Sequence, residues 1–217
     1  MIQKIGLTFM IKNIKALIVA GGTGGHVLPG INLASFLIEK KYKVKIVTDK
    51  RGYKFFKDND KKNVSVFLLS PLIKKNFLFL LFSLLLIFFS ILRSLIFLLF
   101  YRPNIIFGMG GYASFPICIA AAILKIKFVI YENNLIIGRA NKKLLPYAER
   151  IFVSNKNLEG ISSRYNFKIA EIGNIINKEI INFSFGTKTK KRELKILVLG
   201  GSQAAKIFAE ILPKILK

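Results

Sequence analysis

The stretch of sequence that decides the fold is KALIVAGGTGGH, residues 15–26. Its apolar run, Lys15 to Ala20, is typical of a strand buried on both faces of a parallel sheet. The glycines that follow let backbone N–H groups approach an anion, and a helix N-terminus directly after them adds partial positive charge. We therefore interpret residues 21–26 as a phosphate-cradling turn between a strand and a helix. A purely structural tight turn is the alternative interpretation.

The turn matches neither of two common nucleotide-binding motifs. The dinucleotide pattern G-x-G-x-x-G, started at Gly22, would end at Val27 instead of glycine. The Gly-Lys-Ser/Thr end of the ATP-binding pattern is also missing after the turn. These departures disfavour both a nicotinamide site and an ATP site.

Short apolar runs alternate with helical patterns along most of the chain. After the first strand, apolar residues recur at helical spacing between Ile31 and Ile38. This alternation predicts an α/β fold, a doubly wound parallel sheet with helices on both of its faces. Further strands are predicted at 44–47, 64–69, 104–107, 128–131, 151–153 and 168–172, with helices at 113–124 and 138–145.

Three segments with binding chemistry each come directly after a predicted strand. They are the first glycine turn, a second glycine turn at 108–112, and the run Glu132-Asn133-Asn134. In open parallel sheets, ligands bind outside the carboxyl ends of the strands. The shared position of the three segments therefore favours a binding site at that edge of the sheet.

A second domain is predicted to begin near the end of the sequence. Residues 182–192 are polar and basic, as in a linker, and a strand pattern at 195–199 leads into Gly200-Gly201-Ser202-Gln203 and a helical pattern. We predict a first domain at 1–175, a linker at 176–193, and at 194–217 the first strand, turn and helix of a second α/β domain. That last segment is too short to bury a core alone, since domains usually have more than about 50 residues.

The composition limits the classes of partner. The net charge is +24 over 217 residues, which favours anionic partners such as phosphorylated substrates or acidic lipid, although a compositional bias towards lysine explains it equally well. Nucleic acid is disfavoured as a partner, because the basic residues do not interleave with aromatic side chains as stacking platforms require. Cys118 is the single cysteine, so the chain forms no internal disulfide and suits a reducing compartment.

The segment from Phe77 to Phe100 is almost entirely apolar. It is longer than the roughly 20 residues that a spanning helix needs. However, it lies between two strands of one predicted sheet, and a single span would place the halves of that sheet on opposite sides of a membrane. We therefore favour a helix with one face on the sheet and the other in the membrane surface. A helix buried on all sides and a true span remain the alternatives.

Four side chains near these turns are candidates for chemistry or binding. His26 is the single histidine, and a neutral imidazole at a helix N-terminus can accept a proton from a hydroxyl nucleophile; a capping role is the alternative. Glu132 has three possible roles, as a base, a partner of a sugar hydroxyl, or a cap of the helix near Gly138. Asn134 suits a sugar hydroxyl or a turn, and Ser202 suits a phosphate or a helix N-cap.

These motifs, in this order, resemble the MurG family. Its members are bacterial transferases that add N-acetylglucosamine to undecaprenyl-diphospho-N-acetylmuramoyl-pentapeptide. The resemblance covers nearly the whole chain. It rests on GGTGGHVLPG at 21–30, GMGGY at 108–112, Glu132 and Asn134 with Gly138 and Asn141, Gly173-Asn174, and GGSQ at 200–203.

The resemblance implies a metal-independent, inverting glycosyltransferase with two Rossmann-like domains, the GT-B arrangement, and no cofactor. The first domain would bind the lipid-linked acceptor on the cytoplasmic face of the bacterial inner membrane, with the apolar helix as its docking patch. His26 and Glu132 would be the catalytic residues. The acceptor hydroxyl would attack the anomeric carbon of UDP-N-acetylglucosamine, and UDP would leave.

The same resemblance implies the residues that contact substrate. Both glycine turns would face the acceptor diphosphate, the second through Gly110, Gly111 and Tyr112. The donor would bind mainly in the second domain. Help from the rest of the chain would come from Thr23, Gly24, Gly25, Asn134 and Ser202.

The sequence also departs from the family pattern. Asn177 stands where the family has an arginine, Tyr131 where it has a histidine, and Ala204 where it has a glycine. The pattern of the donor domain stops after its first strand and helix. Two hypotheses follow: an enzyme that acts when a separate C-terminal half is supplied, or a non-catalytic remnant that binds membrane and lipid diphosphate.

Overall fold

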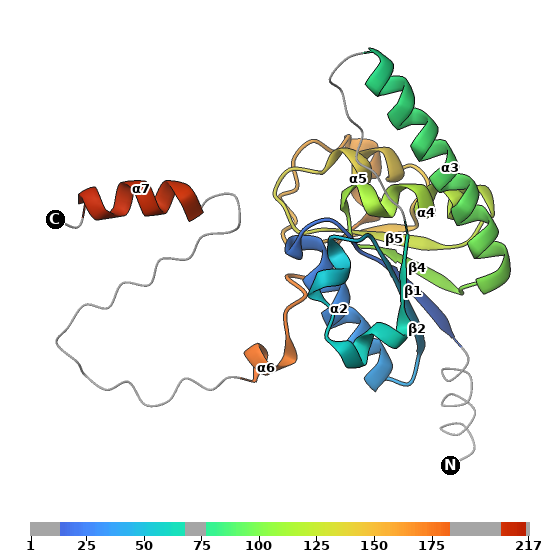
Figure 1. The fold of residues 1–217 in the computed structure, drawn as a ribbon, viewed down its shortest axis with the longest axis horizontal. Helices are drawn as coiled ribbons and strands as arrows, with labels where there is room; N and C mark the ends of the chain where they lie inside the picture. Colours follow the sequence, from blue (N-terminus) through green and yellow to red (C-terminus); the bar gives the residue numbers. More distant parts are fainter. Residues whose placement is uncertain (1–13, 68–76, 183–204, 216–217) are drawn as a thin grey trace. The chain divides into compact units, whose positions relative to one another are not determined.

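The computed structural model of the 217-residue chain describes residues 14–67, 77–182 and 205–215 (Figure 1). The chain divides into two compact units, one up to Asn182 and one from Phe183. Of the second unit, the structure describes one helix, α7 (Ala205–Ile215). The strand predicted at 195–199 and the turn with Ser202 lie outside the described residues. The predicted domain boundary at residue 175 remains a prediction.

The first unit is built on a parallel sheet of seven strands, in the order β3-β2-β1-β4-β5-β6-β7. Every neighbouring pair of strands is parallel, so the predicted α/β fold with a doubly wound parallel sheet is confirmed. The third strand ends at Val66, one residue before the buried Phe67, which is no longer part of the strand; positions 68 and 69 of the predicted range 64–69 lie outside the described residues. The strands are β1 (Lys15–Val19), β2 (Lys43–Thr48), β3 (Val64–Val66), β4 (Ile105–Gly108), β5 (Phe128–Glu132), β6 (Arg150–Val153) and β7 (Ile169–Glu171).

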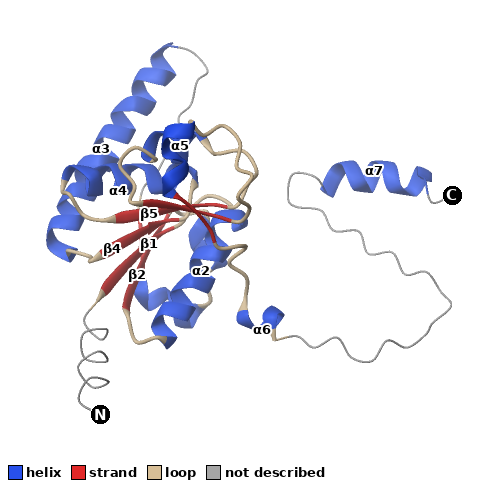
Figure 2. Ribbon diagram, turned by 180° about the vertical axis from the view of Figure 1, so that it is seen from behind, coloured by secondary structure: helices blue, strands red, loops and turns tan. Residues whose placement is uncertain are grey.

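Helices cover both faces of this sheet (Figure 2). One face carries α2 (Gly24–Glu39), and the other carries α4 (Gly111–Ile123) with α3 (Phe77–Tyr101) and α5 (Arg139–Leu144) beside it. A short α6 (Lys178–Ile181) follows the last strand. Three 3-10 helices complete the connections: η1 (Gly52–Phe55), η2 (Asp58–Asn63) and η3 (Ser163–Lys168).

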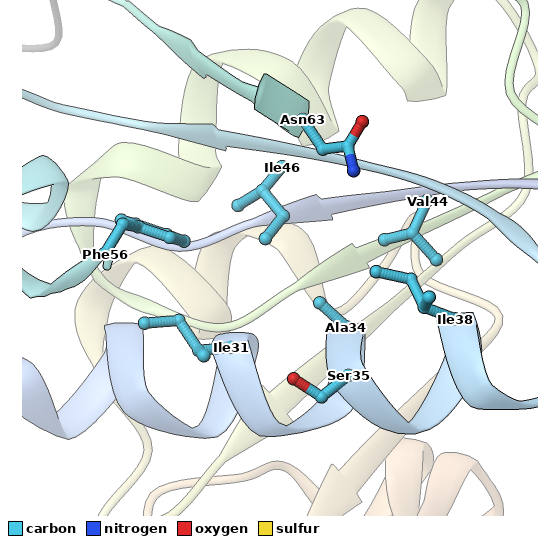
Figure 3. Close-up of a pocket in the computed structure, with 8 residues that line it drawn as sticks. All are labelled: Ile31, Ala34, Ser35, Ile38, Val44, Ile46, Phe56 and Asn63. Carbon is cyan, nitrogen blue, oxygen red and sulfur yellow. The ribbon is translucent and has the colours of Figure 1, made fainter. Parts of the chain in front are cut away.

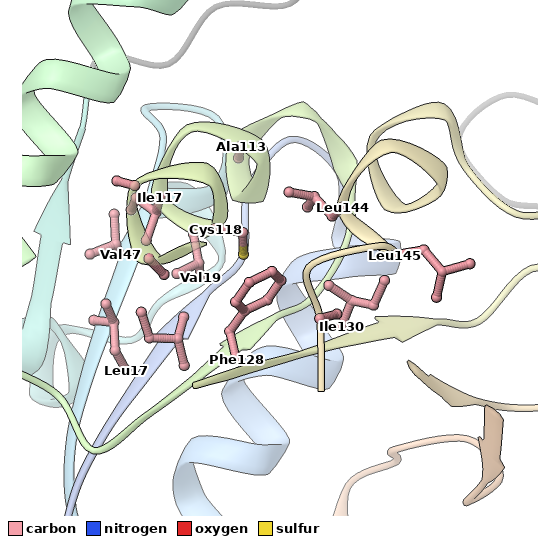
Figure 4. Close-up of a cluster of buried hydrophobic side chains, with 14 of the residues drawn as sticks. Leu17, Val19, Val47, Ala113, Ile117, Cys118, Phe128, Ile130, Leu144 and Leu145 are labelled. Atoms are coloured by element: carbon pink, nitrogen blue, oxygen red, sulfur yellow. The ribbon is translucent and has the colours of Figure 1, made fainter. Parts of the chain in front are cut away.

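The side chains of β1 show why its sequence is apolar without interruption. Leu17 and Val19 point into the core shared with α4 and α5, which Figure 4 shows around Phe128. Ala16 and Ile18 point the opposite way, into the core under α2. Because successive strand residues face opposite sides and both sides are covered, Ala16 to Val19 are all buried, and only Lys15 at the start of the strand is partly exposed.

The strand order decides where the ligand edge lies. Chain connections run outward from β1 to β2 and β3 on one side, and from β4 to β7 on the other. The order therefore reverses between β1 and β4, and in such sheets the crevice at this reversal binds ligands. The turns after these two strands are the two glycine turns of the sequence, residues 21–25 and 109–111.

Helix α3 packs by one side only. Ser83, Ser94 and Leu98 are its buried residues, and Leu95 and Phe97 contact the core. Its other side exposes large apolar side chains from one end to the other. They are Phe77, Leu78, Phe79, Leu81, Phe82, Leu84, Leu85, Phe88, Phe89, Leu92, Ile96, Leu99 and Phe100. The alternative of a helix buried on all sides is therefore wrong, since its packed stripe is too narrow to cover it.

Gly30 tests the contact between α2 and the sheet. A Cβ atom at this position would lie 2.8 Å from the Cβ of Ala20 and 3.4 Å from Ile18 Cγ2. We expect Gly30→Val to lower the free energy of unfolding by about 1 to 3 kcal/mol, because overpacking pushes the helix off the sheet. Urea unfolding followed by circular dichroism measures this, with Ser35→Val at a solvent-accessible position of α2 as the control. Equal stability of the two variants would contradict the packing described.

Candidate active site

The first glycine turn ends in the N-terminus of α2. Thr23 is the N-cap residue and is exposed, and no acidic side chain lies in the first turn of the helix. The N–H groups of Gly24 and Gly25 belong to that first turn, where helix geometry leaves donors without an intrahelical partner. The N–H of Gly22 points elsewhere, to Asp49 Oδ1 at 2.9 Å. The first-turn donors at this helix N-terminus are thus the N–H groups of Gly24 and Gly25, which with Thr23 are among the predicted substrate-binding residues.

The second glycine turn holds the ring of His26. Gly110 and Gly111 have φ values of +89° and +73°, which favour glycine. A Cβ atom on Gly110 would lie 3.0 Å from His26 Nδ1, and one on Gly111 would lie 3.1 Å from His26 Cδ2. The missing side chains thus make room for the imidazole, which joins the two turns.

A backbone carbonyl sets the orientation of this imidazole. His26 Nδ1 lies 3.0 Å from the carbonyl oxygen of Met109. A carbonyl oxygen only accepts, so the hydrogen of the neutral ring resides on Nδ1 and the lone pair on Nε2. The side chain is partly exposed. His26 therefore has the tautomer that a general base at Nε2 requires.

A buried acid that the sequence analysis did not single out joins the same turns. Asp49, at the end of β2, is 4% exposed and accepts from Gly22 N–H, from Gly52 N–H at 2.8 Å, and from the hydroxyl of Tyr112. Arg51 in turn donates to the Tyr112 hydroxyl. The sequence did offer one indication that Asp49 belongs to the site, since it is a polar residue directly after a predicted strand. Its partners depended on β2 lying beside β1, which the sequence did not show.

The charges of this cluster support one another. Burial alone would raise the pKa of Asp49, but the hydrogen bonds from Tyr112, Gly22 and Gly52 and the charge of Arg51 outweigh it, so the pKa is lowered. Burial and the bond to Asp49 raise the pKa of Tyr112, so its hydroxyl keeps the proton that it donates. The cluster is thus a charged network that fixes the first turn to the second.

Glu132 has the capping role among its predicted alternatives. Its side chain is buried, and its carboxylate accepts four hydrogen bonds. Oε1 accepts from the backbone and the side-chain nitrogen of Asn134, at 3.1 and 2.7 Å, and Oε2 accepts from Gly138 N–H at 2.8 Å and Asn141 Nδ2 at 3.0 Å. Donors therefore occupy both oxygens, and this geometry gives no support to Glu132 as a catalytic base.

The two asparagines after β5 differ in what they contact. Asn133 Nδ2 donates to the carbonyl oxygen of Gly25 at 3.2 Å, which ties this loop to the first glycine turn. Asn134 is exposed, and its amide nitrogen donates to Glu132. Because the side chain is exposed, its amide oxygen can accept from a ligand. The structure thus brings the loop of Asn134 to the edge that holds Thr23 and Gly25.

Two departures from the family pattern have structural roles here. The hydroxyl of Tyr131 donates to the carbonyl of Gly173 at 3.4 Å and accepts from Ile175 N–H at 3.3 Å, so it fastens the segment after β7. Asn177 is the N-cap of α6, and its side-chain oxygen accepts from Glu179 N–H at 2.9 Å. Both residues therefore order the end of the first unit.

Other candidates lie away from this edge or lack reactivity. A hollow of about 60 Å³ lies between α2 and β2, lined by Ile31, Ala34, Ser35, Ile38, Val44, Ile46, Phe56 and Asn63 (Figure 3). Six of its eight lining residues are apolar, and its volume is far below the roughly 300 Å³ of common ligand sites. Burial raises the pKa of the Cys118 thiol to about 12, so this side chain is not a nucleophile.

Comparison with known families agrees with this geometry. A model of the glycosyltransferase family 28 N-terminal domain matches residues 16–153, which include β1, both glycine turns and β6. The chain belongs to this family. The predicted resemblance to the MurG family agrees with the names of its curated relatives.

The curated relatives carry one name. The chain is 34% identical to the UDP-N-acetylglucosamine–N-acetylmuramyl-(pentapeptide) pyrophosphoryl-undecaprenol N-acetylglucosamine transferase of Pelagibacter ubique, over 92% of this chain and 55% of that protein. It is 33% identical to the transferase of the same name from Rickettsia bellii, over 94% of this chain and 56% of that protein. The chain thus spans about half the length of these relatives.

Solved structures share the fold. The crystal structure of Acinetobacter baumannii MurG superposes with a TM-score of 0.67 at 23% identity, over 93% of this chain and 54% of that one. A glycosyltransferase from Rickettsia africae superposes with a TM-score of 0.53 at 17% identity, over 74% of this chain and 43% of that one. At these identities the likeness concerns the fold alone.

The Asp49 cluster gives a pH-dependent prediction. Because the folded pKa is lowered, the stabilisation from ionised Asp49 is complete above the unfolded carboxyl value of about 4 and is lost as the pH falls through the lower folded value. We expect Asp49→Asn to reduce the free energy of unfolding at pH 7 by about 1.5 to 3 kcal/mol. The difference from the wild type should shrink below about pH 4.

Urea unfolding between pH 3 and pH 7 measures this difference. Glu149→Gln, at an exposed position, removes the same charge and serves as the control. A deficit of Asp49→Asn that stayed constant down to pH 3 would show that the ionised carboxylate does not stabilise the two turns.

Proposed function

We propose that this chain is the acceptor-binding part of an inverting N-acetylglucosaminyltransferase. The reaction would move N-acetylglucosamine from UDP-N-acetylglucosamine to undecaprenyl-diphospho-N-acetylmuramoyl-pentapeptide, a step of peptidoglycan synthesis. The family membership and the shared name of the relatives support the reaction. The single observation that carries it is the imidazole of His26, held between two glycine turns with Nε2 as its lone-pair nitrogen.

The proposed step is a single displacement. As the acceptor hydroxyl oxygen bonds to the anomeric carbon, His26 Nε2 takes the hydroxyl proton. The bond from that carbon to the donor diphosphate breaks, and UDP leaves with the electron pair, which inverts the anomeric configuration. The N–H groups of Thr23, Gly24 and Gly25, with the second turn at Gly110 to Tyr112, would bind diphosphate, and no metal or cofactor is needed.

The donor requires residues beyond those described. Asn134 is the predicted donor contact within the first unit, while Ser202 belongs to a segment outside the described residues. Since the chain spans about half the length of its relatives, we propose that transfer requires a donor-binding domain equivalent to the other half. That domain would act as the partner of this chain. The non-catalytic alternative would bind the lipid diphosphate and not transfer sugar even with that domain present.

A reconstituted assay tests the reaction and the role of His26. Purified chain is mixed with UDP-N-acetylglucosamine and a lipid-linked acceptor, with and without a donor domain from a relative. We expect transfer when the donor domain is present. His26→Gln should then lower kcat by about 10²- to 10⁴-fold with a smaller change in KM, because it removes the proton acceptor.

The controls separate the two hypotheses. Glu132→Gln should affect kcat mainly through folding, so its thermal midpoint should fall together with its activity. If the donor domain is shown to be folded and to bind UDP, and the mixture still transfers no sugar, the enzyme hypothesis is wrong and the binding remnant is favoured.

We further propose that α3 docks peripherally on an anionic bilayer at the cytoplasmic face. Its exposed side carries only apolar residues and Arg93 over most of its length. The hydroxyls of Ser83, Ser90 and Ser94 donate to backbone carbonyls four residues earlier, so they do not require water. Net charge of +24 suits acidic headgroups.

Packing disfavours a true span by α3. Leu95, Phe97 and Leu98 contact the protein core, so the last turns of the helix belong to the domain. The part of α3 before Leu95 is roughly 27 Å long, less than the roughly 30 Å of a hydrocarbon core. Arg93 also lies with its guanidinium 4.5 Å from the ring centre of Phe67, against the domain. We therefore favour immersion of one side of the helix in the membrane surface.

Two phenylalanines of equal exposure test the docking surface. Phe88 on α3 and Phe36 on α2 are each 54% exposed. We expect Phe88→Glu to weaken binding to anionic liposomes at least about tenfold. The substitution removes an aromatic ring that would be buried in the bilayer and adds a negative charge that the anionic lipids repel. Phe36→Glu is the matched control and should bind as the wild type does. Flotation with anionic and neutral vesicles at low and high salt measures binding, and equal loss in both variants would count against α3.

A further inference from the structure

Arg51 is an exposed cation held in a fixed orientation. Its side chain is 59% exposed, although Nη2 donates to the hydroxyl of Tyr112. Its Nε lies 3.5 Å from Asp49 Oδ2, and its Cζ lies 5.2 Å from the ring centre of Tyr112. An exposed arginine usually samples many rotamers, and ordering one costs free energy. Here the contacts with Tyr112 and Asp49 order the side chain before any ligand binds.

The position of this guanidinium is between the two glycine turns. A Cβ atom on Gly22 would lie 3.9 Å from Arg51 Nη2 and 3.4 Å from Tyr112 Cε1. Tyr112 directly follows Gly111, so the aromatic ring and the guanidinium stand where the turns meet. Ionised Asp49, which accepts from the N–H of Gly22, would by itself repel a phosphate at the first turn. The positive charge of Arg51 beside it offsets this repulsion.

We propose that Arg51 directly binds the diphosphate of a substrate at the meeting point of the two glycine turns, and that Tyr112 and Asp49 position it. This inference rests on the proposed function and adds a residue to it. A guanidinium has five N–H donors in a planar fork, and its protein partners leave several of them exposed. The fork matches two phosphate oxygens at once, which a lysine ammonium does not.

The ligand chemistry is a diphosphate ester, and two substrates carry one. The lipid-linked acceptor and the sugar-nucleotide donor would each bring a diphosphate to this edge of the sheet. Farnesyl diphosphate serves as the probe for the first source and UDP as the probe for the second. Both are titrated into the full chain in detergent, and the dissociation constant is measured by calorimetry.

The variants separate binding from positioning. We expect Arg51→Gln to weaken binding of a diphosphate probe by about ten- to a hundredfold, and Arg51→Lys to restore only part of it. Lys50→Gln, the adjacent exposed cation, removes the same charge and should leave binding within about twofold. Tyr112→Phe removes only the hydroxyl and leaves the backbone of the second turn in place. It should weaken binding several-fold in the wild type and have no effect in the Arg51→Gln background, because this hydroxyl acts through Arg51.

Each outcome decides between the ideas. Weaker binding of farnesyl diphosphate by Arg51→Gln supports the acceptor as the source, and weaker binding of UDP supports the donor. If the wild type binds a probe and Arg51→Gln binds it with the same dissociation constant, the role of Arg51 is overturned and the proposed function still stands. If the folded wild type binds neither farnesyl diphosphate nor UDP, both proposals are overturned. Thermal midpoints near that of the wild type show that the variants are folded.

Discussion

The close approach of the two glycine turns is the constraint on which the rest of the site depends. A Cβ atom on Gly21 would lie 2.6 Å from the Cβ of Ala113 in the first turn of α4, so the strand end and the helix meet at backbone distance. This closeness places the imidazole of His26 in contact with the second turn. It also lets Asp49 and Tyr112 bond across the gap. None of these contacts would form if β1 and β4 were not neighbours in the sheet.

The sequence predicted the fold well because short apolar runs alternate with helical patterns, and the runs of β1, β4 and β5 lead directly into glycine or polar turns. It predicted the glycine turns and His26 for the same reason, since local pattern alone reveals them. Asp49 was missed because the partners that link it to the two glycine turns, Gly22 and Tyr112, are 27 and 63 residues away and depend on strand order. Glu132 stayed ambiguous because a carboxylate after a strand suits catalysis and capping alike, and only its four donors distinguish the two. The predicted residue Ser202 lies outside the described residues.

The apolar helix and the departures from the family pattern show a second limit of sequence reasoning. Composition described α3 as apolar but not which side packs, because nearly all of its residues have the same character. Packing of Leu98 and exposure of Phe88 settle that question. Similarly, Asn177 read as a lost arginine, whereas in the structure it caps α6. A substitution that removes one contact can therefore keep a local role that no motif records.

The exposed side of α3 has a consequence for the behaviour of the protein in water. Contiguous apolar surface of this extent is rare on monomeric soluble proteins and promotes association. Without a bilayer or detergent, the same surface on another copy of the chain is the nearest apolar substitute. Copies would then associate through α3 and hide the very surface that we propose to dock on lipid. The oligomeric state of the purified chain is thus set by its solvent, and a measurement made without detergent reports on that solvent.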